Sequence, residues 1–241
     1  MLKIFGVRLI RIPPPIVNAP WINDQMFNGL ARLKQLEIPI TTIVDIGAAA
    51  GSWTLLATRL WPECSYMLFE PLEERADELK TLAASNPNIF IVPYAAGKTI
   101  SETRFHVTDD LDGSGIAPKT GGTSESVRVV KQTSVDIEIK KNQLTGPYLV
   151  KLDTHGYEIP IIEGCEEILD QVSAFIIECY GFQVAENSLL FWEMCRYMDN
   201  LGFRLFDIVD IMNRPKDGAF WQCDAFFIRK ENALFNNNSY N

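Results

Sequence analysis

Short apolar runs alternate along this chain with segments whose apolar positions recur every third or fourth residue. The runs are rich in β-branched and aromatic residues, which is typical of buried strands. The segments between them have helical spacing, as in the series Leu72, Ala76, Leu79 and Leu82. Strands are predicted over residues 42–46, 66–69, 89–92, 148–152, 174–177, 204–208 and 223–228.

This alternation predicts an α/β fold with a mostly parallel seven-stranded sheet and helices on both faces. Helices are expected after the first strand, with Ser52 as the N-cap, after the second strand, after Gly156, and over about 188–201. A turn at 214–218 joins the last two strands, so the last strand should run antiparallel. Strands at 103–107 and 127–130 enclose a loop at 109–126, which predicts a hairpin insertion.

The chain divides into one main domain over 41–235, an N-terminal segment over 1–40 that packs on it, and a flexible tail over 236–241. The apolar stretch 1–12 carries basic residues and ends at three prolines, so we expect a docked edge segment or a flexible arm and no signal peptide. No run has the length of a membrane span.

The composition limits the classes of partner that we expect and the compartment in which the protein works. The net charge is −9 and the pI about 4.8, which disfavours binding to a phosphate backbone. The five cysteines are odd in number and lack metal-site spacing, so we expect buried free thiols and a cytoplasmic location. The oligomeric state is not predicted.

The first candidate site is the stretch from Asp45 to Gly51, where a strand ends in an acid and two glycines precede a helix. Such a turn lets a ligand approach backbone amides, which indicates a nucleotide-type ligand; the alternative is a turn needed only for packing. Glu70 ends the next strand, where a carboxylate accepts hydrogen bonds from the two ribose hydroxyls of an adenosine. The third glycine of the dinucleotide fingerprint is absent, and acids favour a cationic sulfonium, so S-adenosylmethionine is favoured over NAD.

The second candidate site is the stretch from Lys151 to Glu158, at the carboxyl end of a later strand. Asp153, His155 and Glu158 converge there, and His155 is the candidate base for an acceptor alcohol. A structural loop is the alternative for His155. We include no metal in the predicted site. The competing interpretation is a magnesium or calcium site built from Asp153 with Glu178, or from Asp109, Asp110 and Asp112.

Three motifs resemble the FkbM-type methyltransferases, which depend on S-adenosylmethionine and mostly methylate hydroxyl groups. They are V-D-I-G-A-A-A-G from Val44, F-E-P from Phe69, and K-L-D-T-H-G-Y-E from Lys151 with Gly164 beyond it. The family has Asn at the position of Ala49 and Glu or Gln at that of His155. The resemblance covers about 42–234 and implies the Rossmann-like class I methyltransferase fold. It also implies cofactor contacts, and the predicted set is Asp45, Gly47, Ala48, Ala49, Gly51, Trp53, Glu70 and Pro71.

The resemblance makes an O-methyltransferase the leading interpretation, with Asp153, His155 and Glu158 at the reaction centre. The acceptor would be a small-molecule or glycan hydroxyl, contacted by the loop at 109–126 and by Tyr180 and Trp221. Two other interpretations remain, a nicotinamide-dependent oxidoreductase and a cofactor-binding module without catalysis.

Overall fold

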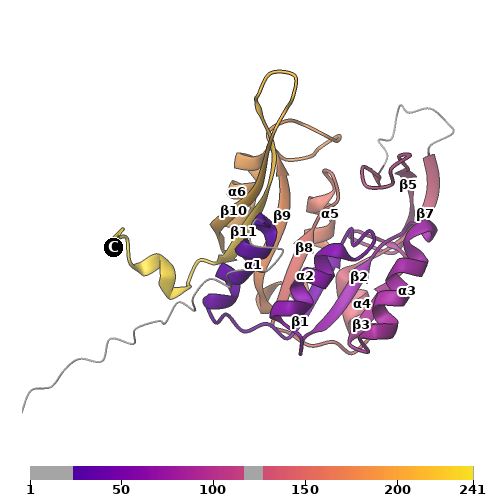
Figure 1. Ribbon diagram of the computed structural model, residues 1–241, viewed down its shortest axis with the longest axis horizontal. Coiled ribbons are helices and arrows are strands. Elements are labelled where there is room, and N and C mark those ends of the chain that lie inside the picture. Colours follow the sequence, from indigo (N-terminus) through magenta and orange to yellow (C-terminus); the bar gives the residue numbers. More distant parts are fainter. Residues whose placement is uncertain (1–23, 117–126, 241) are drawn as a thin grey trace, which may run out of the picture.

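The structure is a computed structural model that describes residues 24–116 and 127–240 (Figure 1). The prediction for 1–12 and the part of the predicted loop at 117–126 lie outside the described residues. The division of the chain into three segments stays a prediction.

The main sheet has seven strands in the order β10-β11-β9-β8-β1-β2-β3. All of them run parallel except β11, which is antiparallel to both of its neighbours. This confirms the predicted mostly parallel sheet with an antiparallel last strand. The bounds are β1 Thr42–Ile46, β2 Ser65–Phe69, β3 Ile89–Val92, β8 Tyr148–Leu152, β9 Val172–Tyr180, β10 Phe203–Asn213 and β11 Phe220–Arg229.

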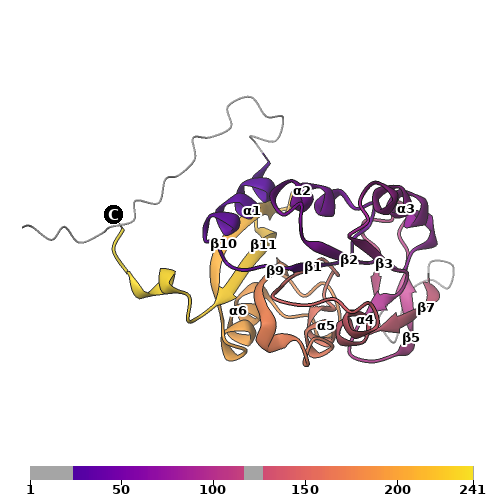
Figure 2. The ribbon, with the colours of Figure 1, turned by 90° about the horizontal axis from the view of Figure 1, so that it is seen from below.

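Helices cover both faces of the sheet (Figure 2). One face carries α1 (Gln25–Gln35), α2 (Ser52–Leu60) and α3 (Ala76–Ser85); the other carries α4 (Val135–Lys141), α5 (Glu158–Glu163) and α6 (Phe191–Asn200). The sequence analysis missed α1 and α4. Both begin at a capping side chain: Asp24 accepts from the Phe27 amide, and Ser134 accepts from the Ile137 amide.

The insertion is larger than a hairpin. Strands β5 (Ser101–His106) and β7 (Val127–Thr133) pair antiparallel as expected. Two short strands, β4 (Ala95–Ala96) and β6 (Gly115–Ile116), extend the pair into a second sheet in the order β4-β7-β5-β6. Strands of two residues carry no periodicity, so only the folded backbone reveals them. The segment from Leu111 to β6 lies beside residues at the carboxyl ends of β1, β2 and β8.

Several predicted boundaries were wrong. Ser52 does not cap α2, because Gly51 holds the N-cap position with φ +82° and no side chain caps this helix. Strands β9, β10 and β11 are longer than predicted, since their ends stay paired with the neighbouring strands beyond the apolar runs in the sequence. A single turn of 3₁₀ helix at Glu73–Arg75 precedes α3.

The cysteines are all free, as predicted, and four of the five are buried. The sheet is apolar on both faces because buried side chains from alternate positions pack under each helical layer. No helix in the described part of the chain is long and apolar enough to cross a membrane.

Candidate active site

A cavity of about 340 Å³ opens at the carboxyl edge of the main sheet. Its walls come from the ends of β1, β2, β8 and β9, together with β6 and the residues before it. Ligands of open α/β sheets bind at this edge. Of the predicted site residues, the cavity is lined by Gly47, Ala49, Glu70, Pro71, Asp153 and His155.

The glycines of the first turn serve packing within the protein. Gly47 has φ +78°, and a Cβ on it would lie 2.1 Å from the backbone carbonyl oxygen of Asp153. A Cβ on Gly51 would lie 2.6 Å from Leu82. Because both missing side chains would point into protein, the glycines allow close packing of the turn. Of the turn residues, Gly47 and Ala49 line the cavity.

Ala49 is held in a left-handed conformation, with φ +45°. Its amide donates a 2.9 Å hydrogen bond to Oε2 of Glu70. Asn adopts this backbone conformation more readily than Ala, which gives a physical reason for the Asn at this position in the family. The replacement of the family's Asn by Ala49 therefore affects the backbone conformation of the turn.

Glu70 ties the two strand ends together. Its Oε1 accepts from the Leu72 amide at 2.9 Å while its Oε2 accepts from Ala49. The side chain is buried, and burial raises its pKa despite these two bonds. Each oxygen keeps a second acceptor position, so the carboxylate can take a diol from the cavity side.

Four predicted cofactor residues lie behind the cavity wall in the part of the chain described: Asp45, Ala48, Gly51 and Trp53. Asp45 is fully buried, accepts from the Thr54 hydroxyl at 2.6 Å and faces the Lys151 ammonium at 3.6 Å. Burial raises the pKa of Asp45. Trp53 Nε1 and Asp45 Oδ1 are buried without a hydrogen-bond partner among the described residues.

Asp153 faces the cavity from the end of β8. Lys151 lies 3.1 Å from its Oδ2, and the two residues share one side of the sheet with Asp45. Burial acts to raise the pKa of Asp153, but the Lys151 ammonium and the His155 ring outweigh it and hold the pKa below its usual value. Asp153 is therefore a carboxylate at neutral pH.

His155 is bonded on both ring nitrogens. Nδ1 lies 2.9 Å from the Tyr180 hydroxyl and 3.2 Å from Oε2 of Glu178, and Nε2 donates to the backbone carbonyl of Asp112 at 2.8 Å. Burial lowers the pKa of His155, but Glu178 and Asp153 outweigh it and raise the pKa to about 9. The ring is therefore an imidazolium at neutral pH, a form that donates protons and does not accept them.

Glu178 is the centre of this cluster. It is buried at the end of β9 and accepts from His155, from the Tyr180 hydroxyl and from the Gln222 amide. The sequence analysis gave Glu178 only an alternative metal role. Its signal was a lone acid at the end of an apolar strand, which the antiparallel pairing with β11 later placed beside Gln222.

Glu158 lies away from the cavity in the described structure. It is buried at the start of α5, where it accepts from the Gly156 amide at 2.9 Å and from the Thr154 hydroxyl at 3.1 Å. Burial raises its pKa. These contacts fold the loop that carries His155, which itself has φ +53°.

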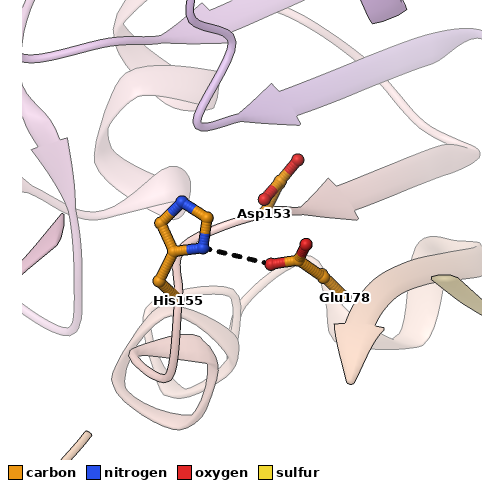
Figure 3. A group of neighbouring side chains, drawn as sticks. All are labelled: Asp153, His155 and Glu178. Atoms are coloured by element: carbon orange, nitrogen blue, oxygen red, sulfur yellow. Dashed lines mark hydrogen bonds and ion pairs between the residues drawn. The ribbon is translucent and has the colours of Figure 1, made fainter. Parts of the chain in front are cut away.

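In the described structure Asp109, Asp110 and Asp112 do not form a group of metal-type ligands. Asp110 bonds to Thr108, and Asp112 pairs with Arg75. The part of the chain described has one group of metal-type ligands, which is Asp153, His155 and Glu178. Figure 3 shows these three side chains converging from β8, the loop after it, and β9.

A second hollow of about 560 Å³ adjoins the cavity. The two share His155, Gly115 and Ile116, and the far wall is residues 183–186. Trp221 lies near this wall. The centroid of its ring is 5.7 Å from that of Phe182, with the rings stacked, and 6.0 Å from that of Tyr180, with the rings edge-on. His106, Ala95 and Ala96 also border the two hollows, although no sequence motif pointed to them. Thr154 and Tyr157 line the first cavity as well; they lie inside the third motif, but the sequence analysis assigned them no role of their own.

The model of the methyltransferase FkbM domain matches residues 45–205. No curated protein matches the chain in sequence. Solved structures with a similar fold include a Burkholderia thailandensis 1,6-didemethyltoxoflavin-N1-methyltransferase with bound S-adenosylhomocysteine, at 12% identity, covering 87% of this chain and 80% of that one, with TM-score 0.46.

Two further structures are similar at 11% identity and TM-score 0.46. The similarity to the magnesium protoporphyrin IX methyltransferase of Synechocystis PCC 6803 covers 84% of this chain and 76% of that one. The similarity to an rRNA methylase from Streptococcus thermophilus covers 89% of this chain and 98% of that one. The matched domain covers about two thirds of the chain and takes in all three motifs apart from Val44, the first residue of the first motif. The chain therefore belongs to the FkbM methyltransferase family, whose cofactor is S-adenosylmethionine.

Proposed function

We propose that this methyltransferase transfers a methyl group from S-adenosylmethionine to a hydroxyl of a small molecule or glycan. One observation carries the proposal: Glu70 and the His155–Glu178 cluster line the same cavity. A diol-binding acid and a polar group suited to an acceptor therefore face the same space.

The residues of the first turn fit the cofactor. Glu70 has free acceptor positions for the ribose hydroxyls, and the backbone of Gly47 and Ala49 leaves room beside them. Asp45 and Trp53 lie behind this wall. Asp45 Oδ1 and Trp53 Nε1 are buried there without a hydrogen-bond partner among the described residues. The remaining predicted contacts, Ala48, Gly51 and Pro71, support the turn or border it.

The sulfonium of the bound cofactor supplies an electrophilic methyl group. Among the described residues, the acids that line the cavity (Glu70, Asp112, Asp153 and Glu178) outnumber its one cationic side chain, His155, and this excess favours a cationic ligand. An acceptor oxygen placed in the hollow beside residues 183–186 lies across His155 from Glu70. On attack, the oxygen–carbon bond forms as the carbon–sulfur bond breaks, sulfur keeps the electron pair, and the hydroxyl proton passes to the neutral form of His155. Positioning and exclusion of water supply most of the rate.

The proposed role of His155 as base requires a neutral ring. At neutral pH the ring is protonated on both nitrogens, and Nε2 donates its proton to the Asp112 carbonyl. That bond must open and Nε2 must release its proton to solvent before the nitrogen can take the proton of the acceptor hydroxyl. We propose that the loop carrying Asp112 gives way to the acceptor. The five free cysteines support a reducing compartment, and we place the enzyme in the cytoplasm on that ground.

Calorimetric titration with S-adenosylhomocysteine tests the cofactor site. Glu70→Ala should weaken binding at least tenfold, because two backbone amides and the ribose lose their acceptor. Glu73→Gln, an exposed acid three residues along, is the matched control and should bind like the native chain. Equal affinity of Glu70→Ala and the native chain would remove the ribose assignment.

A screen of hydroxylated acceptors for release of S-adenosylhomocysteine tests the reaction. Turnover with a hydroxylated acceptor supports the proposal, and methylation restricted to amines would overturn the oxygen acceptor. Cofactor binding with no turnover on any acceptor would instead support the binding module, which the departures at Ala49 and His155 favour. The family match argues against the nicotinamide oxidoreductase.

A further inference from the structure

Three potential metal-ligand atoms converge in the cavity, one each from Asp153, His155 and Glu178. All lie within 4.8 Å of one another, and all three residues line the same cavity. The closest pair is Nδ1 of His155 and Oε2 of Glu178, at 3.2 Å (Figure 3). The convergence therefore faces open space that a solvent molecule or an acceptor can enter.

The spacing suits a small divalent cation. Octahedral bonds of about 2.1 Å put adjacent ligands about 3.0 Å apart and opposite ligands about 4.2 Å apart. The 3.2 Å pair matches adjacent positions, and the outer limit of 4.8 Å needs only a small inward movement. The three atoms thus approach a coordination shell before any ion enters.

The far side of each of the three residues is already held. Lys151 bonds Oδ2 of Asp153, Gln222 bonds Oε1 of Glu178, and Nε2 of His155 donates to the Asp112 carbonyl. A metal-binding histidine commonly donates its other N–H to a carbonyl or carboxylate in this way, which orients the ring. Each side chain is therefore positioned from outside and turns one atom inward.

We propose that Asp153, His155 and Glu178 bind one divalent metal ion, preferably Mn²⁺, whose remaining coordination positions are open to the cavity. Two carboxylates favour Mg²⁺ or Mn²⁺, and an imidazole nitrogen shifts the preference toward Mn²⁺ and the later first-row ions. The Tyr180 hydroxyl lies 2.9 Å from Nδ1 of His155 and donates to Oε2 of Glu178, so it moves aside or joins the shell when the ion binds. Binding of the ion displaces the Nδ1 proton of His155 to solvent.

The ion has a defined task, which rests on the methyl transfer proposed above. An acceptor hydroxyl that occupies an open position loses its proton to solvent more readily, because the cation stabilises the alkoxide. The metal then replaces His155 as the group that activates the acceptor, since a nitrogen bound to the ion cannot take a proton.

Titration of the full chain with Mn²⁺ tests the site, with calorimetry for affinity and electron paramagnetic resonance for the ligands. We expect one Mn²⁺ per chain and spin-echo modulation from an imidazole nitrogen. Glu178→Gln should weaken Mn²⁺ binding at least tenfold, and His155→Gln should abolish the nitrogen modulation. Asp109→Asn, in the exposed acidic loop, is the matched control and should bind Mn²⁺ like the native chain.

Titration with S-adenosylhomocysteine on the same samples separates the two proposals and reports folding of each variant. A native chain that binds S-adenosylhomocysteine but not Mn²⁺ would overturn the metal site alone. Equal Mn²⁺ affinity of native chain and Glu178→Gln would do the same, and loss in Asp109→Asn would move the ion to the loop. Mn²⁺ binding without S-adenosylhomocysteine binding would leave the metal site standing and count against the proposed function.

Discussion

A Cβ atom on Gly47 would lie 2.1 Å from the backbone carbonyl oxygen of Asp153. The turn after β1 and the loop after β8 therefore touch directly through their backbones. This contact joins the predicted cofactor side of the cavity to its reaction side, so that a displacement of one loop must displace the other.

Gly47→Ala should lower the free energy of unfolding by more than about 2 kcal/mol and weaken S-adenosylhomocysteine binding, because φ is +78° and backbone blocks the new methyl. Urea unfolding measures the first effect and calorimetry the second. Gly218→Ala is the matched control: its φ is +73°, with nothing within 4 Å of the new atom, and it should cost about 1 kcal/mol. Equal losses in the two variants would show that the contact with Asp153 is unimportant.

Ala49→Gly should stabilise the chain by about 1 kcal/mol, because it removes the cost of a left-handed alanine and keeps the amide bonded to Glu70. Ala49→Asn, which restores the residue usual in the family, should give a smaller gain. The control is the buried neighbour Ala48, where a change to Gly should destabilise. Thermal unfolding of the variants decides the matter, and a loss of stability in Ala49→Gly contradicts the backbone explanation.

Stability of the metal-free protein should fall between pH 6.5 and 9 because of His155. Its folded pKa of about 9 lies above the unfolded value of about 6.5, so the stabilisation is complete below pH 6.5 and is lost as pH rises through 9. The amount is about 3 kcal/mol. Urea unfolding in EDTA across this range measures the slope. His155→Gln should lack it, and identical slopes in the two proteins would show that Glu178 does not hold the proton on the ring.

Asp224→Asn should raise the melting temperature at pH 8 more than at pH 5. Burial, followed by the charge of Asp153, raises the pKa of Asp224 to about 7. A raised acid pKa contributes stability at low pH that is lost as pH rises through 7, so at pH 8 the buried carboxylate is charged at a cost. Glu231→Gln, an exposed acid, is the control and should show no such difference. A pH-independent effect in Asp224→Asn would contradict this explanation.

The strands of the main sheet were predictable because a buried parallel strand is apolar at nearly every position. Strands β1, β3 and β8 begin and end where the sequence placed them, and the antiparallel last strand followed from the turn at 214–218. The two-residue strands β4 and β6 were missed because they depend on partners far along the chain. The helices α1 and α4 were missed although each begins at a local capping side chain, Asp24 and Ser134. Glu158 showed the same limit: its position in the motif suggested chemistry, while its contacts are with its own loop.

By itself, the sequence determined the α/β alternation, the three motifs and their order, because these follow from local spacing and residue type. The tertiary structure alone decided what faces the cavity. It turned Asp45 and Trp53 behind the wall and brought Glu178 from β9 to His155. The packing around β9 also surrounded His155 with acids that keep it protonated. Such effects depend on distance between side chains, and distance across a sheet is set by strand order and register, which no single segment encodes.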